Sequence, residues 1–450
     1  MIAGPDRVFS AAARIECRPS RIVRRSAIPK KLLLIAYHFP PLQGSTGVHR
    51  TLAFAKYLQE YGWDVTVLTA HPRAYPRVSA ENEEAVPAHV DVVRAFALDA
   101  QRHLSLFGRY PSALATPDRW QSWIVGGYFA GARLIRRWSP DAIMSTYPIA
   151  SAHVIAARLQ RTFKLPWIAD LRDPMAQSDY PPDPRIREAY FRIEQDIVRQ
   201  ASRMTVTTAG TAALYRERYP QYPSDSIVVI PNGFDEAAFA RLGGAPALQS
   251  SEPRRKLQLL HSGLLYPNER NPNAFFAAVA ELCAEGRLSA EDVEFVFRGG
   301  GNEAAYRERL DCLRLNSIVK LLPSVPYAEA LKEMQAADAC MLFQASNCNQ
   351  QIPAKVYEYL YCAKPILALT DPVGETGQLL ASFRIKPVTP LDDKEKIKQA
   401  LPAFIEALRQ GRAAVPLRDQ IMRYSRRDLT RCLAETLDKS IAQSRRTANA

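Results

Sequence analysis

Three charged residues follow an apolar, strand-like stretch of this chain and are of the types that hydroxyl chemistry requires. The segment PWIADLRDP places Asp170, Arg172 and Asp173 directly after a strand predicted at residues 167–169. Carboxylates at a strand end can act as bases or bind hydroxyl groups. The alternative is a structural ion pair between Arg172 and Asp173 that ties down the loop.

Two glycine-containing loops are candidates for binding an anion. Gly44 and Gly47 lie between a strand predicted from residue 31 and the following helix, and Gly300 follows a strand predicted at 294–298. The backbone N–H groups of such loops can approach a phosphate at a helix N-terminus. Each loop can equally be a plain turn. The first loop lacks the GxGxxG pattern, which disfavours an NAD-dependent dehydrogenase.

The second half of the chain adds a cation and a carboxylate. Gly263 and Arg270 belong to HSGLLYPNERNP, which joins a strand predicted at 257–261 to a helix at 272–285. Arg270 stands just before the helix, where its charge adds to the helix dipole and favours a phosphate. Glu358 lies one turn inside a helix predicted at 354–361 and can accept both hydroxyls of a ribose. A surface glutamate is the alternative.

The elements that position these residues alternate regularly. Continuous apolar runs of strand length, separated by helical patterns, extend over 31–230 and again over 257–369. Such runs are typical of parallel strands buried on both faces. The pattern predicts an α/β fold with two doubly wound, Rossmann-like domains that face each other across a ligand-binding cleft. We expect a disordered basic extension at 1–30, domains at 31–235 and 257–415, a linker at 236–256, and a C-terminal helix and tail at 416–450.

Composition narrows the functional class further. The chain has 450 residues and a net charge of +13, and its longest apolar stretch, 123–132, is too short to span a membrane. Arg133, Arg136 and Arg137 follow that stretch, so we expect peripheral association with an anionic membrane surface, with a core helix as the alternative. No secretory signal is recognisable, which indicates a cytoplasmic protein. The sequence has no CxxC pair that would suggest a zinc site. Only the basic extension favours binding to nucleic acid.

Taken together, the motifs resemble those of the retaining glycosyltransferases of the GT-B fold, family 4. The resemblance covers residues 31–382 and depends on the order YHFPP, PWIADLRDP, PNGFD, HSGLLYPNERNP, FRGGG and IPAKVYEYLYCAKPILAL. It implies transfer of a hexose from a nucleotide-diphosphate sugar to the hydroxyl of a glycan or lipid-linked acceptor. It also implies that no metal ion or cofactor is needed, and that the pathway is surface polysaccharide or lipopolysaccharide synthesis.

The resemblance assigns roles to particular residues. Arg270 neutralises the donor diphosphate with Lys355 and the glycine-loop amides close by, and Glu358 binds the nucleotide ribose. The acceptor side is expected to use Asp170, Arg172 and Asp173. The glycines of these loops are Gly44, Gly47, Gly263 and Gly300.

Three positions depart from the family pattern. Asp170 stands where many members have a histidine, although a branch of the family carries the same DLRDP pattern. Leu264 stands where a second cation is usual, so we expect Arg270 to lack a cationic neighbour. Gln350 replaces an acidic residue that usually contacts the sugar. Two alternatives therefore stay open: a nucleotide-sugar epimerase-like enzyme on the same fold, and a non-catalytic nucleotide-sugar-binding protein.

Overall fold

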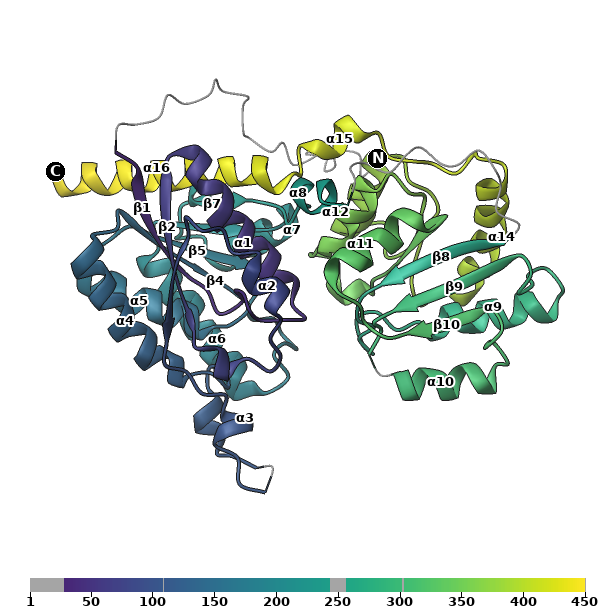
Figure 1. The fold of residues 1–450 in the computed structure, drawn as a ribbon, viewed down its shortest axis with the longest axis horizontal. Coiled ribbons are helices and arrows are strands. Elements are labelled where there is room, and N and C mark those ends of the chain that lie inside the picture. The colour runs from purple at the N-terminus through teal and green to yellow at the C-terminus, as the bar shows by residue number, and fades with distance from the viewer. Residues whose placement is uncertain (1–27, 108, 243–255, 302, 450) are drawn as a thin grey trace, which may run out of the picture. The chain divides into compact units, whose positions relative to one another are not determined.

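A computed structural model describes residues 28–107, 109–242, 256–301 and 303–449. The chain forms two compact units (Figure 1), the second of which is Pro231–Leu429, while the first takes in the chain up to Ile230 and again from Thr430. The predicted extension lies outside the described residues up to residue 27, as does the predicted linker over 243–255. Residues 236–240 of that linker form a short helix, α8 (Glu236–Ala240), which Asp235 caps and which buries Phe239.

A seven-stranded parallel sheet forms the centre of the first unit. Its strand order is β3-β2-β1-β4-β5-β6-β7, the order of a doubly wound sheet with one added strand. The strands form because apolar residues follow one another without interruption: Leu32, Leu33, Leu34 and Ile35 are all fully buried. The strands are β1 (Lys30–Ile35), β2 (Trp63–Ala70), β3 (Asp91–Ala95), β4 (Ala142–Thr146), β5 (Trp167–Arg172), β6 (Arg203–Val206) and β7 (Ile227–Val229).

Helices connect successive strands of this sheet and cover it. Ser45 begins the first of them, because its side chain accepts a hydrogen bond from the Gly47 amide. The apolar stretch predicted at 123–132 lies in α4, whose buried side packs on the sheet core. The helices are α1 (Thr46–Tyr57), α2 (Ala80–Glu84), α3 (Ala100–His103), α4 (Ser122–Trp138), α5 (Ser151–Phe163), α6 (Pro184–Gln200) and α7 (Ala209–Arg218).

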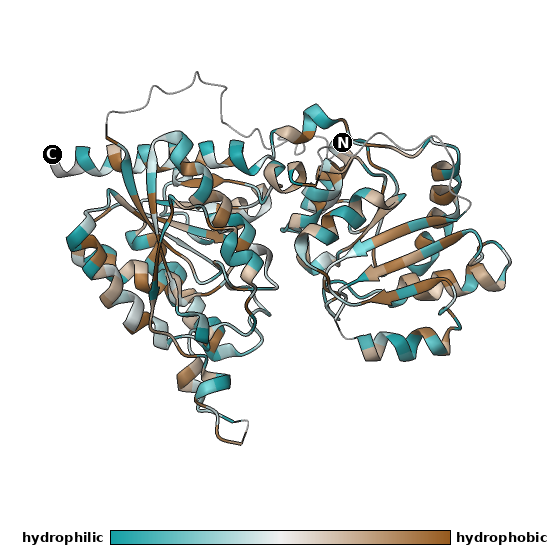
Figure 2. Ribbon diagram, viewed as in Figure 1, coloured by the Kyte–Doolittle hydropathy of each residue, from teal (hydrophilic) through white to brown (hydrophobic). Residues whose placement is uncertain are grey.

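The second unit repeats the same plan with six parallel strands in the order β10-β9-β8-β11-β12-β13. Adjacent residues of one strand point to opposite faces, so Leu259 joins one apolar core and Leu260 the other. Figure 2 shows the strands of this sheet mostly in brown, as expected for a sheet covered on both sides. The strands are β8 (Leu257–Ser262), β9 (Val293–Arg298), β10 (Val319–Leu322), β11 (Ala339–Phe343), β12 (Ile366–Leu369) and β13 (Val388–Thr389).

The helices of the second unit lead to one that the two units share. They are α9 (Asn273–Ala284), α10 (Glu303–Cys312), α11 (Tyr327–Ala336), α12 (Ala354–Tyr361), α13 (Glu375–Ser382), α14 (Lys394–Arg409) and α15 (Arg418–Met422). The last helix, α16 (Arg426–Asn449), starts in the second unit and belongs to the first from Thr430. There Asp438 pairs with Lys30, and Gln443 accepts a hydrogen bond from Arg203. No helix in the described part of the chain is long and apolar enough to cross a membrane.

Candidate active site

The strand that carries Asp170 runs further than its apolar residues predict. The expected strand at 167–169 is β5, which continues to Arg172 with a register shift between Asp170 and Arg172. Arg172 has a φ of +58°, a left-handed conformation that is uncommon for a residue with a side chain. A bulge changes the direction of the side chains that follow it, so the side chains of Asp170 and Arg172 lie in different surroundings.

Asp170 is fully buried and its carboxylate is saturated with donors. Arg50 of α1 donates to both of its oxygens, with N–O distances of 3.0 and 3.3 Å. Thr146 and Thr205, at the ends of neighbouring strands, donate at 2.9 and 2.7 Å. Burial alone would raise the pKa of Asp170, but the charge and hydrogen bonds of Arg50 hold it below its usual value. This geometry favours a role for Asp170 in holding α1 and three strand ends together, not in touching a substrate.

Arg172, His38 and Gly47 converge at the start of α1. A Cβ atom on Gly47 would lie 2.6 Å from Arg172 Nη1 and 2.7 Å from His38 Nδ1, so a side chain at this position would displace Arg172 or His38. His38 shares a hydrogen bond of 2.8 Å with the Ser45 hydroxyl. Burial and the Arg172 charge lower the pKa of His38 to about 3, which keeps its ring neutral. Gly44, with a φ of +86°, lies exposed just before this cluster.

Asp173, the next acidic residue of this segment, is partly buried. Desolvation raises its pKa, although Arg172 and Arg50 oppose that effect. Arg172 also contacts the carbonyl oxygen of Tyr147 at 3.5 Å, the outer limit for a hydrogen bond. The first unit therefore presents Arg172, Asp173 and His38 at the carboxyl ends of its strands, which is where α/β sheets bind ligands.

In the second unit, Lys355 and His261 form a buried polar pair. His261 Nδ1 lies 3.0 Å from the carbonyl oxygen of Met341, so Nδ1 carries the proton and Nε2 accepts from Lys355 Nζ at 3.3 Å. Burial lowers the pKa of Lys355 well below its usual value, and the charge of Arg270 lowers it further. Burial and Lys355 lower the pKa of His261.

Lys355 is a second basic residue whose charge interacts with that of Arg270, although Leu264 supplies no cation within the loop of Arg270 itself. This second basic residue comes from α12. The Arg270 guanidinium donates to the Leu264 carbonyl at 3.2 Å and lies over the Tyr266 ring at 5.2 Å. Burial and the charge of Arg270 both disfavour the protonated form of Lys355, and an anionic ligand at this place would favour that form again.

Glycines shape this cationic group, which we call the Arg270–Lys355 cluster. Gly263 has a φ of +114°, and a Cβ atom there would lie 2.9 Å from Lys355 Nζ. Because glycine has no side chain, the backbone of this loop can lie close to the lysine. Gly300 lies behind the loop, where its carbonyl accepts from the Leu265 amide at 2.7 Å. Its contacts therefore make it a support for the loop.

Glu358 follows Lys355 on the same helix and is largely buried. Its Oε1 accepts a hydrogen bond of 2.7 Å from the Tyr327 hydroxyl. Tyr327 gives no sequence signal for this role, because it stands 31 residues earlier on another helix. Gln350 lies half-buried in the loop before α12, and this loop is tied to the Arg270 loop by a 2.8 Å bond from the Ala345 amide to the Glu269 carbonyl.

No cluster of three or more potential metal ligands occurs among the residues that the structure describes. The second unit thus combines two basic residues, a neutral histidine and a carboxylate near one edge of its sheet. Such a set can bind a diphosphate through the basic residues and a sugar hydroxyl through the carboxylate. The first unit combines an arginine with a partly buried aspartate, a set that suits hydroxyl groups.

Residues 46–233 match the model of a protein family described as "Glycosyl transferase 4-like domain". No curated protein sequence matches the chain. Solved structures with a similar fold include sucrose-phosphate synthase from Thermosynechococcus elongatus, with a TM-score of 0.64, 14% identity, and coverage of 92% of this chain and 100% of that chain. HepE from Anabaena in complex with UDP-glucose has a TM-score of 0.62 and 15% identity, covering 91% and 99%. UDP-GlcNAc 2-epimerase from Neisseria meningitidis has a TM-score of 0.54 and 15% identity, covering 91% and 100%.

Two doubly wound parallel sheets of this order, together with these likenesses, give the chain the GT-B fold. The fold expected from the sequence is confirmed. Within that class, residues 46–233 are similar to the glycosyl transferase 4-like family.

Proposed function

We propose that this protein transfers a hexose from a nucleotide-diphosphate sugar to an acceptor hydroxyl, with retention of the anomeric configuration and without a metal ion. The observation that carries the proposal is the place of Lys355, whose Nζ lies against Gly263 in the loop that also contains Arg270, with Glu358 one turn further along α12. A nucleotide-diphosphate sugar offers the matching groups, because it joins two phosphates to a ribose with two vicinal hydroxyls.

In the proposed reaction, the bond between the anomeric carbon and the β-phosphate oxygen breaks, and a bond to the acceptor oxygen forms on the same face. The acceptor proton leaves on the departing diphosphate. Negative charge grows on the β-phosphate as its bond breaks, and Arg270 and Lys355 stabilise that charge from fixed positions. Bound diphosphate raises the pKa of Lys355, so the lysine is protonated when the charge develops.

The remaining roles follow the geometry of each unit. Glu358, oriented by the Tyr327 hydroxyl, accepts hydrogen bonds from the ribose. Arg172 and Asp173 orient the acceptor, while Asp170 and Gly47 hold the ends of β5 and α1 in place. The acceptor is a glycan or a lipid-linked glycan, and the pathway is surface polysaccharide or lipopolysaccharide synthesis.

The test is a donor screen followed by product analysis. Nucleoside diphosphates and their sugars are scanned by thermal shift, since a ligand that binds the native protein raises the melting temperature by mass action. The donor that binds is then incubated with candidate acceptors, and proton NMR of the product reads the anomeric configuration. We expect an acceptor-dependent product with the anomeric configuration of the donor, formed equally in excess EDTA. An inverted product or loss of turnover in EDTA would overturn that part of the mechanism.

The similarity in fold to the N. meningitidis enzyme favours the epimerase-like alternative. Its distinguishing outcome is conversion of the donor sugar with no acceptor present. The non-catalytic alternative predicts nucleotide binding with no turnover of any donor. Leu264 and Gln350 motivate this alternative, and Lys355 of α12 offers a basic group that Leu264 does not.

A further inference from the structure

A hairpin after α3 exposes large apolar side chains that the proposed transfer reaction does not use. Figure 1 shows α3 and the loop beyond it extending away from the body of the first unit. Leu106 and Arg109 close the hairpin with two backbone bonds of 2.8 and 3.0 Å. At its tip, the side chain of Phe107 is 96% exposed, and that of Leu106 is 73% exposed. Figure 2 shows this tip in brown.

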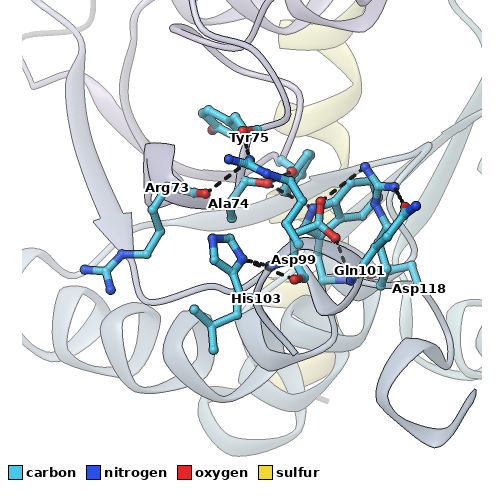
Figure 3. Close-up of polar contacts among 12 residues, drawn as sticks. Arg73, Ala74, Tyr75, Asp99, Gln101, His103 and Asp118 are labelled. Carbon is cyan, nitrogen blue, oxygen red and sulfur yellow. Dashed lines mark hydrogen bonds and ion pairs between the residues drawn. The ribbon is translucent and has the colours of Figure 1, made fainter. Parts of the chain in front are cut away.

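The base of the hairpin is held by a polar network. Asp99 is fully buried, caps α3 by accepting from the Gln101 amide at 3.0 Å, and pairs with Arg119 at 3.2 Å. His103 Nδ1 lies 3.0 Å from the Asp99 amide nitrogen, and Arg102 donates to the Tyr75 carbonyl. Figure 3 shows these contacts converging beneath α3. Phe107 itself has a φ of +51°, a costly conformation that the surrounding bonds maintain.

The outer side of α4 also exposes apolar side chains. Val125 and Phe129 are 56% and 67% exposed and lie four residues apart, hence on one side of the helix. The next positions of that stripe are Arg133 and Arg137, both exposed. The Ser122 hydroxyl bonds with the amide and the carbonyl of Leu98, at 2.8 and 3.1 Å, which connects the start of α4 to the chain that leads into α3.

Charge identifies the partner of this surface. Residues 96–138 contain six arginines and no lysine, and their two acidic residues, Asp99 and Asp118, are both buried. The segment therefore exposes apolar side chains and arginines to solvent, and it has no exposed carboxylate of its own. A protein partner would have to match both features with a shaped surface. An anionic bilayer matches them without any shape, because its headgroups attract arginine and its acyl boundary accepts leucine and phenylalanine.

We propose that the α3 hairpin and the outer side of α4 form a membrane-binding surface for anionic lipid. Leu106 and Phe107 enter the boundary between headgroups and acyl chains. Arg109, Arg133 and Arg137 face the headgroups. The inference corrects the sequence-based expectation in one respect: most apolar residues of 123–132 pack into the core, and the exposed apolar tip lies in the hairpin instead.

The experiment is sedimentation of the purified full chain with vesicles of phosphatidylcholine alone or with phosphatidylglycerol added. We expect binding to the anionic vesicles, release at high salt because the headgroup attraction is screened, and little binding to phosphatidylcholine alone. The double variant Leu106→Asp/Phe107→Asp should lower the partition coefficient at least tenfold. Leu417→Asp changes a similarly exposed leucine of the second unit and should bind as the wild type does.

A second readout places the tip. Phe107→Trp should show fluorescence quenching by brominated lipid chains in anionic vesicles. Wild-type protein that stays in the supernatant, a hairpin variant that binds normally, or an unquenched tryptophan in bound protein would each overturn the proposal. A drop in molecular mass from dimer to monomer in the hairpin variant would also overturn it, in favour of a contact between copies of the chain. Nucleotide binding should be equal in all variants, so the result is independent of the proposed function.

Discussion

Removing the guanidinium of Arg270 is the change that most directly tests the Arg270–Lys355 cluster. Arg270→Ala deletes one of the two basic residues of the cluster and leaves Lys355 in place beside Gly263. Loss of one preorganised electrostatic donor typically lowers turnover by about 10²–10³, or about 2.7–4 kcal/mol of transition-state stabilisation. Arg270→Lys should recover part of this loss, since a lysine supplies the charge without the planar fork.

A pH profile separates this electrostatic role from a structural one. Arg270 lowers the pKa of Lys355, so Arg270→Ala lets that pKa rise towards its usual value. Lys355 then keeps its proton to higher pH, and the alkaline limb of nucleotide-diphosphate binding should move to higher pH. A structural role for Arg270, through its bond to the Leu264 carbonyl, would lower the melting temperature without moving that limb.

The assays are steady-state turnover with the donor found by thermal shift, and calorimetric affinity for the nucleoside diphosphate between neutral and alkaline pH. Arg287→Ala is the matched control, because it removes an exposed arginine of the same unit that pairs only at the surface with Glu285. Its turnover should equal that of the wild type. A loss below about fivefold in Arg270→Ala, with an unmoved alkaline limb, would refute the reasoning and leave Arg270 a surface residue.

Three further substitutions test the rest of the candidate site. Glu358→Gln should weaken nucleotide binding by about 1.5–3 kcal/mol in calorimetry with an unchanged melting temperature, since it loses a charge-assisted hydrogen bond; equal affinity would remove Glu358 from the site. Gly47→Ala places a methyl group 2.6 Å from Arg172 Nη1 and should lower turnover at least tenfold while nucleotide affinity stays normal; wild-type turnover would contradict that. Asp170→Asn leaves the buried Arg50 without its counter-charge and should cost about 3–5 kcal/mol in urea unfolding. Because the pKa of Asp170 is lowered in the fold, its contribution is present above about pH 4 and is lost as pH falls through the folded-state pKa, which unfolding curves at several pH values would show.

The alternation of strands and helices was predictable because it depends on the pattern of apolar residues within short segments of the sequence. Strands buried on both faces need unbroken apolar runs, and β1 and β8 follow directly from KLLLI and LQLLH. The end of β5 was not predictable by the same rule. A charged residue after an apolar run looks like a strand end, and Asp170 is kept inside the strand by Arg50, which lies 120 residues earlier.

The sequence motifs single out candidate site residues one at a time, but they do not tell which of these residues lie close together. The motifs indicated Arg270, Lys355 and Glu358 separately, but the interaction of Lys355 with Arg270 depends on how α12 meets the loop after β8. The left-handed backbone of Arg172 has no sequence signature, because the residue is not glycine. Long-range packing decides such features, and a single sequence records them only indirectly.

Because the two units share helix α16, the first unit can complete its folding only after the second unit has been synthesised. The first unit is made first by the ribosome, yet its last piece, from Thr430 onward, is made after the whole second unit. Until then Lys30 and Arg203 lack their contacts with α16, which are made by Asp438 and Gln443. The nascent first unit therefore leaves the ribosome unfinished and exposes the surface that α16 later covers, so a chain cut short before Thr430 cannot complete it.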